Sequence, residues 1–302
     1  MKGAAFFILL VIMINTSCSE SGESEPALYF RGGMDSVSVV NVGGTLKFEG
    51  WPSLQNHELV NQFEFNNQGG IAYAFEEITT NPFDVSEKVL RSVVLDDDPN
   101  VSGTTRAQAT FLFNDGVVLD VYHTSIRMLI DEDVAFLKNY PGNISWFVIY
   151  EAWNDHVDTW DGDGAGSARW NLNLRKETSG TELFWLAQAE TMQPAAVEGD
   201  AIWAHENKTV PVPFNKWFTL DVYLKRGEGT NGRFLIKLTP DGENTIVLFD
   251  VKETTIYPGH PEIRLLSLQP IKFYFNDLYL DWMKSNNKTL ACYYNDFKWY
   301  KK

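Results

Sequence analysis

The sequence is poor in the residues on which several common chemistries depend. Its 302 residues include two cysteines and five histidines, and their spacing fits neither a zinc site nor a Ser/His/Asp or Cys/His catalytic group. Positive charge is also scarce, because 25 lysines and arginines face 40 aspartates and glutamates, which gives a net charge of −15. This excess of negative charge argues against nucleic acid as a partner, since that partner requires cations that neutralise phosphates.

Helical periodicity is almost absent, and short segments of alternating apolar and polar residues take its place. We expect short strands within residues 26–75 and further strands over 89–95, 104–113, 119–130, 144–153, 168–175, 182–191, 217–225, 233–239, 245–251, 271–276 and 290–300. We expect a loop at 79–84, a helical turn or loop at 131–140 and one short helix at 277–286. Many short strands and little helix predict an all-β fold, an antiparallel two-sheet sandwich.

One apolar run lies at the N-terminus, from Ala4 to Ile14, and it is too short to span a bilayer as a helix. It follows a lysine and precedes small residues that end at Cys18. This is the pattern of a signal peptide over residues 1–17. The pattern resembles a bacterial lipoprotein signal, which implies that Cys18 is the lipid-carrying first residue of the mature protein. The alternative is an ordinary cleaved signal with a chance cysteine.

The acidic sequence SESGESE follows Cys18 and predicts a flexible tether over residues 18–27. An acidic stretch in this position resembles the surface-export signal of Bacteroidetes lipoproteins. We therefore expect a protein that is lipid-anchored in the cell outer membrane and faces the exterior, with a single domain over residues 28–302. The other cysteine, Cys292, lies in an apolar run and is expected to be a buried, inert thiol.

Two central segments alternate most clearly, and each has one apolar face and one polar face. In the first segment, one side holds Trp146, Val148, Tyr150 and Ala152, and the other holds Phe147, Ile149, Glu151 and Trp153. In the second segment, the apolar side holds Ala168, Trp170, Leu172 and Leu174, and the polar side holds Arg169, Asn171, Asn173 and Arg175. The combined polar side suits a sugar chain, because sugar rings stack on indole while hydroxyls and carboxylates need fixed hydrogen-bond partners.

Further strands are expected to add polar residues to the same side of this sheet. The added residues are Arg106, Gln108, Gln188, Glu190, Lys272 and Tyr274. The alternative is a solvated sheet surface on which the cations form ion pairs with Glu151 and Glu190. A tryptophan among these residues argues against that alternative, because isolated polar surface seldom includes one.

Other chemistries have weaker support in the sequence. A retaining glycosidase needs two carboxylates about 5 Å apart, but Glu151 is followed by Asp155 and Asp158 only after its strand should have ended. His123 begins a strand and could act as a second base, although a structural or exposed histidine is the alternative. A glycine-rich loop carries oxygen ligands that suit a structural calcium ion, unless the loop is a plain turn; these ligands are Asp158, Asp161 and Asp163.

Two C-terminal segments carry a resemblance to a known family. They are VPFNKWFTLDVYLKRGEGTNGRF, residues 212–234, and WMKSNNKTLACYYNDFKWY, residues 282–300. They resemble concanavalin-like jelly-roll polysaccharide lyases of the heparin-lyase-like and alginate-lyase-like type, over roughly residues 85–300. The resemblance implies a β-jelly-roll sandwich of the concanavalin A-like lectin/glucanase type and an acidic polysaccharide as partner.

The resemblance also implies roles for several residues. Arg106 and Gln108 resemble the family's carboxylate-binding pair, and Lys272 and Tyr274 resemble its late catalytic pair, with Tyr274 as base and acid. Trp153 stands where the family has a histidine. We therefore hypothesise either a lyase that cleaves a uronic-acid-containing polysaccharide by β-elimination or a non-catalytic glycan-binding lipoprotein of a polysaccharide utilisation system. In the lyase, the substrate carboxylate would be neutralised by Arg106, Gln108, Arg169 and Lys272.

Overall fold

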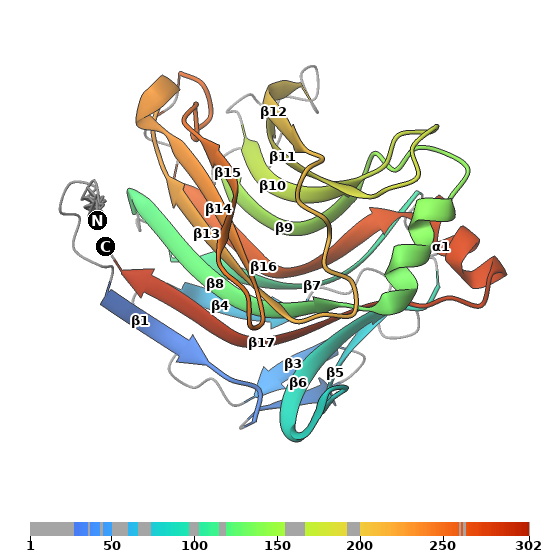
Figure 1. Cartoon of the computed structure of the whole chain (residues 1–302). Coiled ribbons are helices and arrows are strands. Elements are labelled where there is room, and N and C mark those ends of the chain that lie inside the picture. The colour runs from blue at the N-terminus through green and yellow to red at the C-terminus, as the bar shows by residue number, and fades with distance from the viewer. Residues whose placement is uncertain are drawn as a thin grey trace, which may run out of the picture.

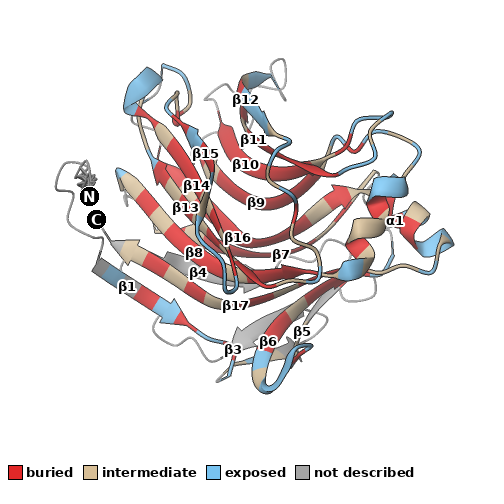
Figure 2. Ribbon diagram, in the orientation of Figure 1, coloured by how far each residue is buried: buried red, intermediate tan, exposed pale blue. Residues whose placement is uncertain are grey.

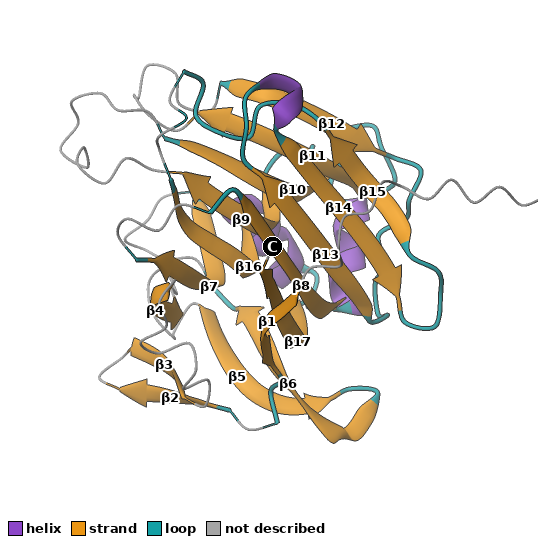
Figure 3. Cartoon of the chain, turned by 90° about the vertical axis from the view of Figure 1, so that its left-hand side faces the viewer, coloured by secondary structure: helices purple, strands orange, loops and turns teal. Residues whose placement is uncertain are grey.

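The computed structural model describes residues 27–35, 37–42, 45–49, 60–65, 74–96, 103–114, 119–154, 167–191, 200–259, 261 and 264–301. Two antiparallel sheets dominate this part of the chain (Figure 1), and the few helices are short (Figure 3). The expected all-β, two-sheet sandwich is therefore confirmed. None of the helices in the described ranges is long and apolar enough to cross a lipid bilayer.

One sheet contains both central segments and has seven strands within the described residues. In spatial order they are β12 (Ala201–Asn207), β11 (Phe184–Thr191), β10 (Ala168–Arg175), β9 (Phe147–Asn154), β16 (Leu265–Asn276), β7 (Thr104–Phe113) and β4 (Val60–Phe65). Strands that are far apart in the sequence are neighbours here, because β16 lies between β9 and β7. This order brings the strands with the predicted site residues into one sheet.

The second sheet has eight strands among the residues described. Seven follow the order β15 (Ile246–Val251), β14 (Arg233–Pro240), β13 (Phe218–Lys225), β8 (Val121–Ile130), β17 (Leu290–Lys301), β6 (Asp84–Val94) and β5 (Ala74–Asn81), and β1 (Ala27–Gly32) also pairs with β17. Other elements are the β2–β3 pair (Ser38–Val42, Thr45–Glu49), the 3₁₀ helices Glu132–Asn139 and Gly229–Asn231, and the helix α1 (Asp277–Ser285).

The core lies between the two sheets and follows from the alternation of each strand. In β13, Phe218 and Leu220 are buried while Thr219 and Asp221 are partly exposed. This strand therefore has one face in the core and one face toward solvent. Tyr150 crosses the core from β9, and its hydroxyl lies 3.4 Å from Thr124 Oγ1 in β8. Figure 2 shows that β9, β10 and β11 are buried along almost their entire length.

The predicted elements agree with the observed ones over most of residues 104–301. The helix expected at 277–286 is confirmed, and Asn276 caps it by accepting a hydrogen bond from the backbone N–H of Leu278. The loop expected at 79–84 is wrong, since only the two residues between Asn81 and Asp84 form the turn that joins β5 to β6. The edge strand β12 was not predicted, because its residues are mostly exposed and do not alternate.

Candidate functional site

The face of the seven-stranded sheet that points away from the core is polar and yet buried. In β10, Arg169, Asn171 and Asn173 are 8%, 0% and 0% exposed. Buried polar groups require partners, which are other polar groups of the protein or a ligand. We call this surface the polar face; it comprises Arg106, Gln108, Trp146, Glu151, Trp153, Arg169, Asn171, Asn173, Arg175, Gln188, Glu190, Gln269, Lys272 and Tyr274.

The strand register arranges these residues in cross-strand rows. One row runs from Arg106 through Tyr274 and Val148 to Asn173. A second row joins Gln188, Asn171, Glu151 and Gln269, with Lys272 opposite Gln108 beside it. A third row joins Glu190, Arg169 and Trp153. The structure therefore brings together the predicted residues of β7, β9, β10, β11 and β16.

A buried ion pair lies near the middle of the polar face. Lys272 and Glu151 are 1% and 0% exposed, and Lys272 Nζ donates hydrogen bonds to Glu151 Oε2 and to Gln269 Oε1. Trp153 Nε1 also donates to Glu151 Oε2. Burial lowers the pKa of Lys272 to about 8, although the charge of Glu151 opposes this shift. Burial would raise the pKa of Glu151, but the positive charges of Lys272 and Arg169 outweigh it and hold this pKa below its usual value.

A second ion pair lies toward the β10–β11 side. Arg169 Nε donates to Glu190 Oε1 at 2.6 Å, and the same oxygen accepts hydrogen bonds from Asn171 at 3.2 Å and Gln188 at 3.1 Å. Arg169 Nη1 also lies 3.8 Å from Glu151 Oε1, so this arginine links the two carboxylates. Much of the positive charge on Arg169 is thus compensated within the protein.

Trp146 belongs to the polar face, although its alternation with Tyr150 placed it on the apolar side. The Arg169 guanidinium carbon lies 4.3 Å from the Trp146 ring centre and 5.6 Å from that of Trp153. Trp146 also meets the Tyr274 ring edge-on at 5.7 Å. The phase changes because β9 has an irregular register near Val148, which shifts the alternation by one residue. Nothing in the sequence marks that irregularity.

Arg106, Tyr274 and Gln108 lie at the β7–β16 side of the polar face. The Arg106 guanidinium carbon is 5.8 Å from the Tyr274 ring centre, and Lys272 Nζ is 5.0 Å from it. The Tyr274 hydroxyl donates to Thr104 Oγ1 at 3.3 Å. Among the described residues, no carboxylate lies within ion-pair distance of Arg106. Its charge is therefore not compensated by any carboxylate of the described residues.

Several buried polar atoms of the polar face have no hydrogen-bond partner in the protein. They are Arg106 Nε, Gln108 Oε1, Trp146 Nε1, Glu151 Oε1 and Asn173 Oδ1. Leaving such atoms unpaired costs about 1–3 kcal/mol each. Because the set includes donors and acceptors, a ligand with both carboxylate and hydroxyl groups would satisfy it.

His123 lies in the other sheet and is not part of the polar face. Its neighbour Tyr122 points into the core, so His123 points to the outer surface of β8. There, His123 Nε2 lies 3.0 Å from Asp221 Oδ1, and its ring stacks on Tyr300 at 4.5 Å. The core separates it from Tyr274, which removes the geometric basis for a role as second base.

Some predicted sites lie outside the described residues. These are the lipidation site Cys18 and the calcium ligands Asp158, Asp161 and Asp163. Within the described part of the chain, no group of three or more His, Cys, Asp or Glu side chains could hold a metal ion. Cys292 is a free, buried cysteine, and burial raises the pKa of its thiol to about 12, in agreement with the expected inert thiol.

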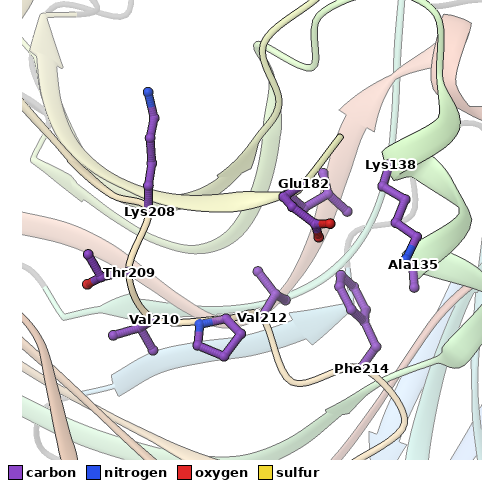
Figure 4. Close-up of a pocket in the computed structure, with 10 residues that line it drawn as sticks. Ala135, Lys138, Glu182, Lys208, Thr209, Val210, Val212 and Phe214 are labelled. Atoms are coloured by element: carbon purple, nitrogen blue, oxygen red, sulfur yellow. The ribbon is translucent and has the colours of Figure 1, made fainter. Parts of the chain in front are cut away.

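A pocket of about 430 Å³ lies elsewhere on the molecule, beside the 3₁₀ helix Glu132–Asn139 (Figure 4). Lys138, Glu182 and Lys208 line it together with the apolar side chains of Val212 and Phe214. It shares no residue with the polar face. We therefore base the functional argument on the polar face, where the charges and the unpartnered buried atoms lie.

Comparison with known proteins shows the fold class. No protein-family model matches the chain, and no curated protein matches it in sequence. The endo-β-1,4-glucuronan lyase of the fungus Trichoderma reesei has a similar structure, with a TM-score of 0.53 and 11% identity over 80% of this chain and 91% of that chain. An alginate lyase from Aplysia kurodai gives a TM-score of 0.46 and 13% identity over 74% and 87% of the two chains. The glucuronan lyase confirms the β-jelly-roll sandwich as the fold.

Proposed function

We propose that the protein cleaves a uronic-acid-containing polysaccharide by β-elimination on its polar face. The observation that carries this proposal is Arg106, which lies beside Tyr274 and is paired with none of the described carboxylates, and whose buried Nε has no hydrogen-bond partner. An arginine next to an acid–base group is what the reaction requires, because the carboxylate must be neutralised before the proton on the adjacent carbon is removed. The lyase named among the similar structures is consistent with this chemistry.

In the proposed reaction, Arg106 and the NH₂ group of the Gln108 side chain donate hydrogen bonds to the substrate carboxylate. Tyr274, as its phenolate, takes the proton from the carbon next to that carboxylate, and the C–H electrons form a carbon–carbon double bond. The bond to the glycosidic oxygen breaks, and Tyr274 returns the proton to that oxygen. Lys272 and Arg169 form ion pairs with Glu151 and Glu190. We therefore assign them a role in holding the other side chains of the polar face in place, and not in binding the substrate carboxylate.

A second candidate is a glycan-binding protein without catalysis. Trp153 stands in place of the family's histidine, and the cations Arg169 and Lys272 are already paired with carboxylates. Both features leave fewer residues that could take part in catalysis. The aromatic and polar groups that could hold a sugar are still present. This alternative shares the polar face and its acidic glycan with the first.

The deciding experiment follows the ultraviolet absorbance of the unsaturated uronate that β-elimination produces. The mature protein is incubated with a panel of acidic polysaccharides, with and without calcium. We expect product that Tyr274→Phe reduces by about 10²-fold or more, while Tyr293→Phe, in the other sheet, leaves the rate unchanged. No product, combined with retardation of the protein by the same glycans in an affinity gel, would instead establish the binding protein.

We also propose that Cys18 carries a lipid that anchors the protein at the outer membrane and exposes it to the exterior. The signal pattern and the acidic segment after Cys18 support this proposal. Cells expressing the full chain should hold it in the membrane fraction and expose it to added protease, and Cys18→Ser should release it. A membrane-bound Cys18→Ser variant would contradict the lipid anchor.

A further inference from the structure

A row of aromatic and apolar side chains crosses the outer face of the eight-stranded sheet, which points away from the core. Strands β14, β13, β8, β17 and β1 lie side by side there (Figure 1), and their register places the members of the row opposite one another. We call it the outer row; it comprises Leu235, Tyr223, His123, Tyr300 and Leu28. The core separates the outer row from the polar face, so the two surfaces lie on opposite sides of the sandwich.

The three rings of the outer row contact one another across the strands. The His123 ring stacks on Tyr300 at 4.5 Å and meets the Tyr223 ring edge-on at 5.8 Å. Asp221 Oδ1 lies 3.0 Å from His123 Nε2 and fixes this central ring. Both tyrosines are partly exposed, and because one strand lies between theirs, they are roughly 10 Å apart. The rings therefore form a fixed aromatic surface that is longer than one sugar ring.

Positive charge borders the outer row, although the whole chain carries −15. The carboxylates beside the row are already paired within the protein, as His123–Asp221, Arg233–Asp250, Arg31–Asp296 and Lys298–Asp296.

Two lysines of the same face add charge that these carboxylates do not neutralise. Lys225 and Lys237 each lie two residues from the row, on β13 and β14, and neither has a carboxylate within ion-pair distance among the described residues. Lys237 and Lys252 add positive charge around Asp250, which Arg233 already binds. The combination of exposed rings and unpaired cations fits a ligand that carries flat rings and negative charge.

We propose that the outer row is a second binding site for an acidic polysaccharide, separate from the polar face. Sugar rings pack against Tyr223 and Tyr300, and carboxylates of the same chain bind the ammonium groups of Lys225 and Lys237. A lipid surface fits less well, because Leu28 is the one strongly exposed apolar side chain of the row. The choice of an acidic glycan rests on the proposed function, and the site itself requires no catalysis.

A second site would change how the protein acts on long chains. A polymer held on the outer row keeps its other segments near the polar face and so raises their local concentration there. A short oligosaccharide cannot occupy both sides of the sandwich and gains nothing from the outer row.

The test measures dissociation constants by affinity electrophoresis in gels that contain increasing amounts of an acidic polysaccharide. Arg106→Ala, which removes a cation of the polar face, provides the background in which the outer row still binds. In this background we expect Tyr300→Ala to weaken binding about tenfold. Tyr293→Ala is the matched control, because Tyr293 lies on β17 beside Arg91 and outside the row, and it should leave binding unchanged.

A second pair of variants tests the cations without disturbing the rings. Lys225→Ala combined with Lys237→Ala removes two side chains that form no ion pair, so the fold does not depend on them, and binding should again weaken about tenfold. Lys216→Ala combined with Lys284→Ala removes the same charge from ion pairs elsewhere on the molecule and should have little effect.

Cleavage provides a readout that a merely structural role would not change. In the otherwise wild-type chain, Tyr300→Ala should leave the rate of unsaturated product from a short acidic oligosaccharide unchanged. The rate on the dilute polymer should fall several-fold.

The outcomes separate this inference from the proposed function. Loss of all retardation in Arg106→Ala, or equal effects of the row variants and their controls, would overturn the second site and leave β-elimination intact. Row-dependent retardation without any unsaturated product would support the second site and overturn the lyase. Row-dependent binding to vesicles of anionic phospholipid, without retardation by the polysaccharide, would assign the row to a membrane instead. No retardation of the wild-type chain by any acidic polysaccharide would overturn both proposals.

Discussion

At the scale of single residues, the buried pair of Lys272 and Glu151 links the charge of the polar face to the stability of the fold. Replacing Lys272 by Met would leave the Glu151 carboxylate buried, with Arg169 Nη1 at 3.8 Å as its nearest described cation. Removing one partner of a buried pair costs about 3–5 kcal/mol. We expect Lys272→Met to lower the free energy of unfolding in urea by about this amount.

A double variant provides the control for that prediction. Lys272→Met with Glu151→Leu removes both charges, and replacing a whole buried pair by apolar groups is often neutral. It should therefore recover most of the stability that the single variant loses. Wild-type stability in Lys272→Met would show that Glu151 does not depend on the ammonium.

The same lysine predicts a pH dependence of ligand binding. Below pH 8, Lys272 is protonated and the polar face keeps its surplus positive charge. As the pH rises through about 8, Lys272 loses its proton, while Glu151, whose pKa is lowered, stays ionised. Affinity for an anionic oligosaccharide should then fall, as measured by titration calorimetry from pH 6 to roughly pH 9. A neutral oligosaccharide is the control, and an equal fall for it would contradict this cause.

The sequence predicts many of these residues but not their contacts. The sequence of β10 places Arg169, Asn171 and Asn173 on one face, because apolar and polar residues alternate along the whole strand. Trp146 was placed incorrectly, because an irregularity in β9 changes the phase without changing the composition. Ion pairs of these cations with Glu151 and Glu190 were an alternative that the sequence left open, but which cation pairs with which carboxylate depends on which strands become neighbours.

At the scale of elements, the connection between β13 and β14 depends on close backbone packing. A Cβ atom at Gly232 would overlap the carbonyl oxygen of Glu253 and lie 2.6 Å from Thr255 Oγ1. The backbone cannot yield as a flexible side chain would, so we expect Gly232→Ala to cost about 1–3 kcal/mol in thermal unfolding. The control is Gly33→Ala, whose Cβ would meet its nearest atom at 4.0 Å. Similar losses in the two variants would refute the packing argument.

Strand β16 shows how tertiary structure modifies an element. The sequence predicts a strand only over 271–276, because Pro270 interrupts the pattern, yet the strand begins at Leu265. Its register with β7 shifts between Leu268 and Ile271, so the proline, which cannot donate a ladder hydrogen bond, lies within an irregularity of the pairing. The extension brings Gln269 to the polar face, where it accepts a hydrogen bond from Lys272.

At the scale of the whole molecule, the sandwich depends on aromatic side chains that fill its core, where Phe111 of one sheet stacks on Phe297 of the other at 4.9 Å. Phe273 is fully buried, and its ring centre lies 5.1 Å from that of Phe147 and 5.4 Å from that of Phe275. Phe273→Ala should lower the free energy of unfolding by about 3–5 kcal/mol. Leu278→Ala, at a side chain that is 60% exposed, should change it by about 0.5 kcal/mol or less. Comparable effects of the two changes would contradict the assigned core.

The fold class followed from the sequence because many short strands without helical periodicity leave few architectures. The order of strands within each sheet did not follow, because alternation fixes which face of a strand is buried and says nothing about its neighbours. The placement of His123 illustrates the difference. Its strand was predicted, but the sheet to which the strand belongs was not.

The last strand of the chain, β17, lies inside the eight-stranded sheet and pairs with β8, β6 and β1. Because β17 lies between β8 and β6, neither of these strands can complete its pairing before β17 is in place. Such long-range pairing delays folding. We therefore expect the eight-stranded sheet to form late and cooperatively, because its central strands come from distant parts of the chain.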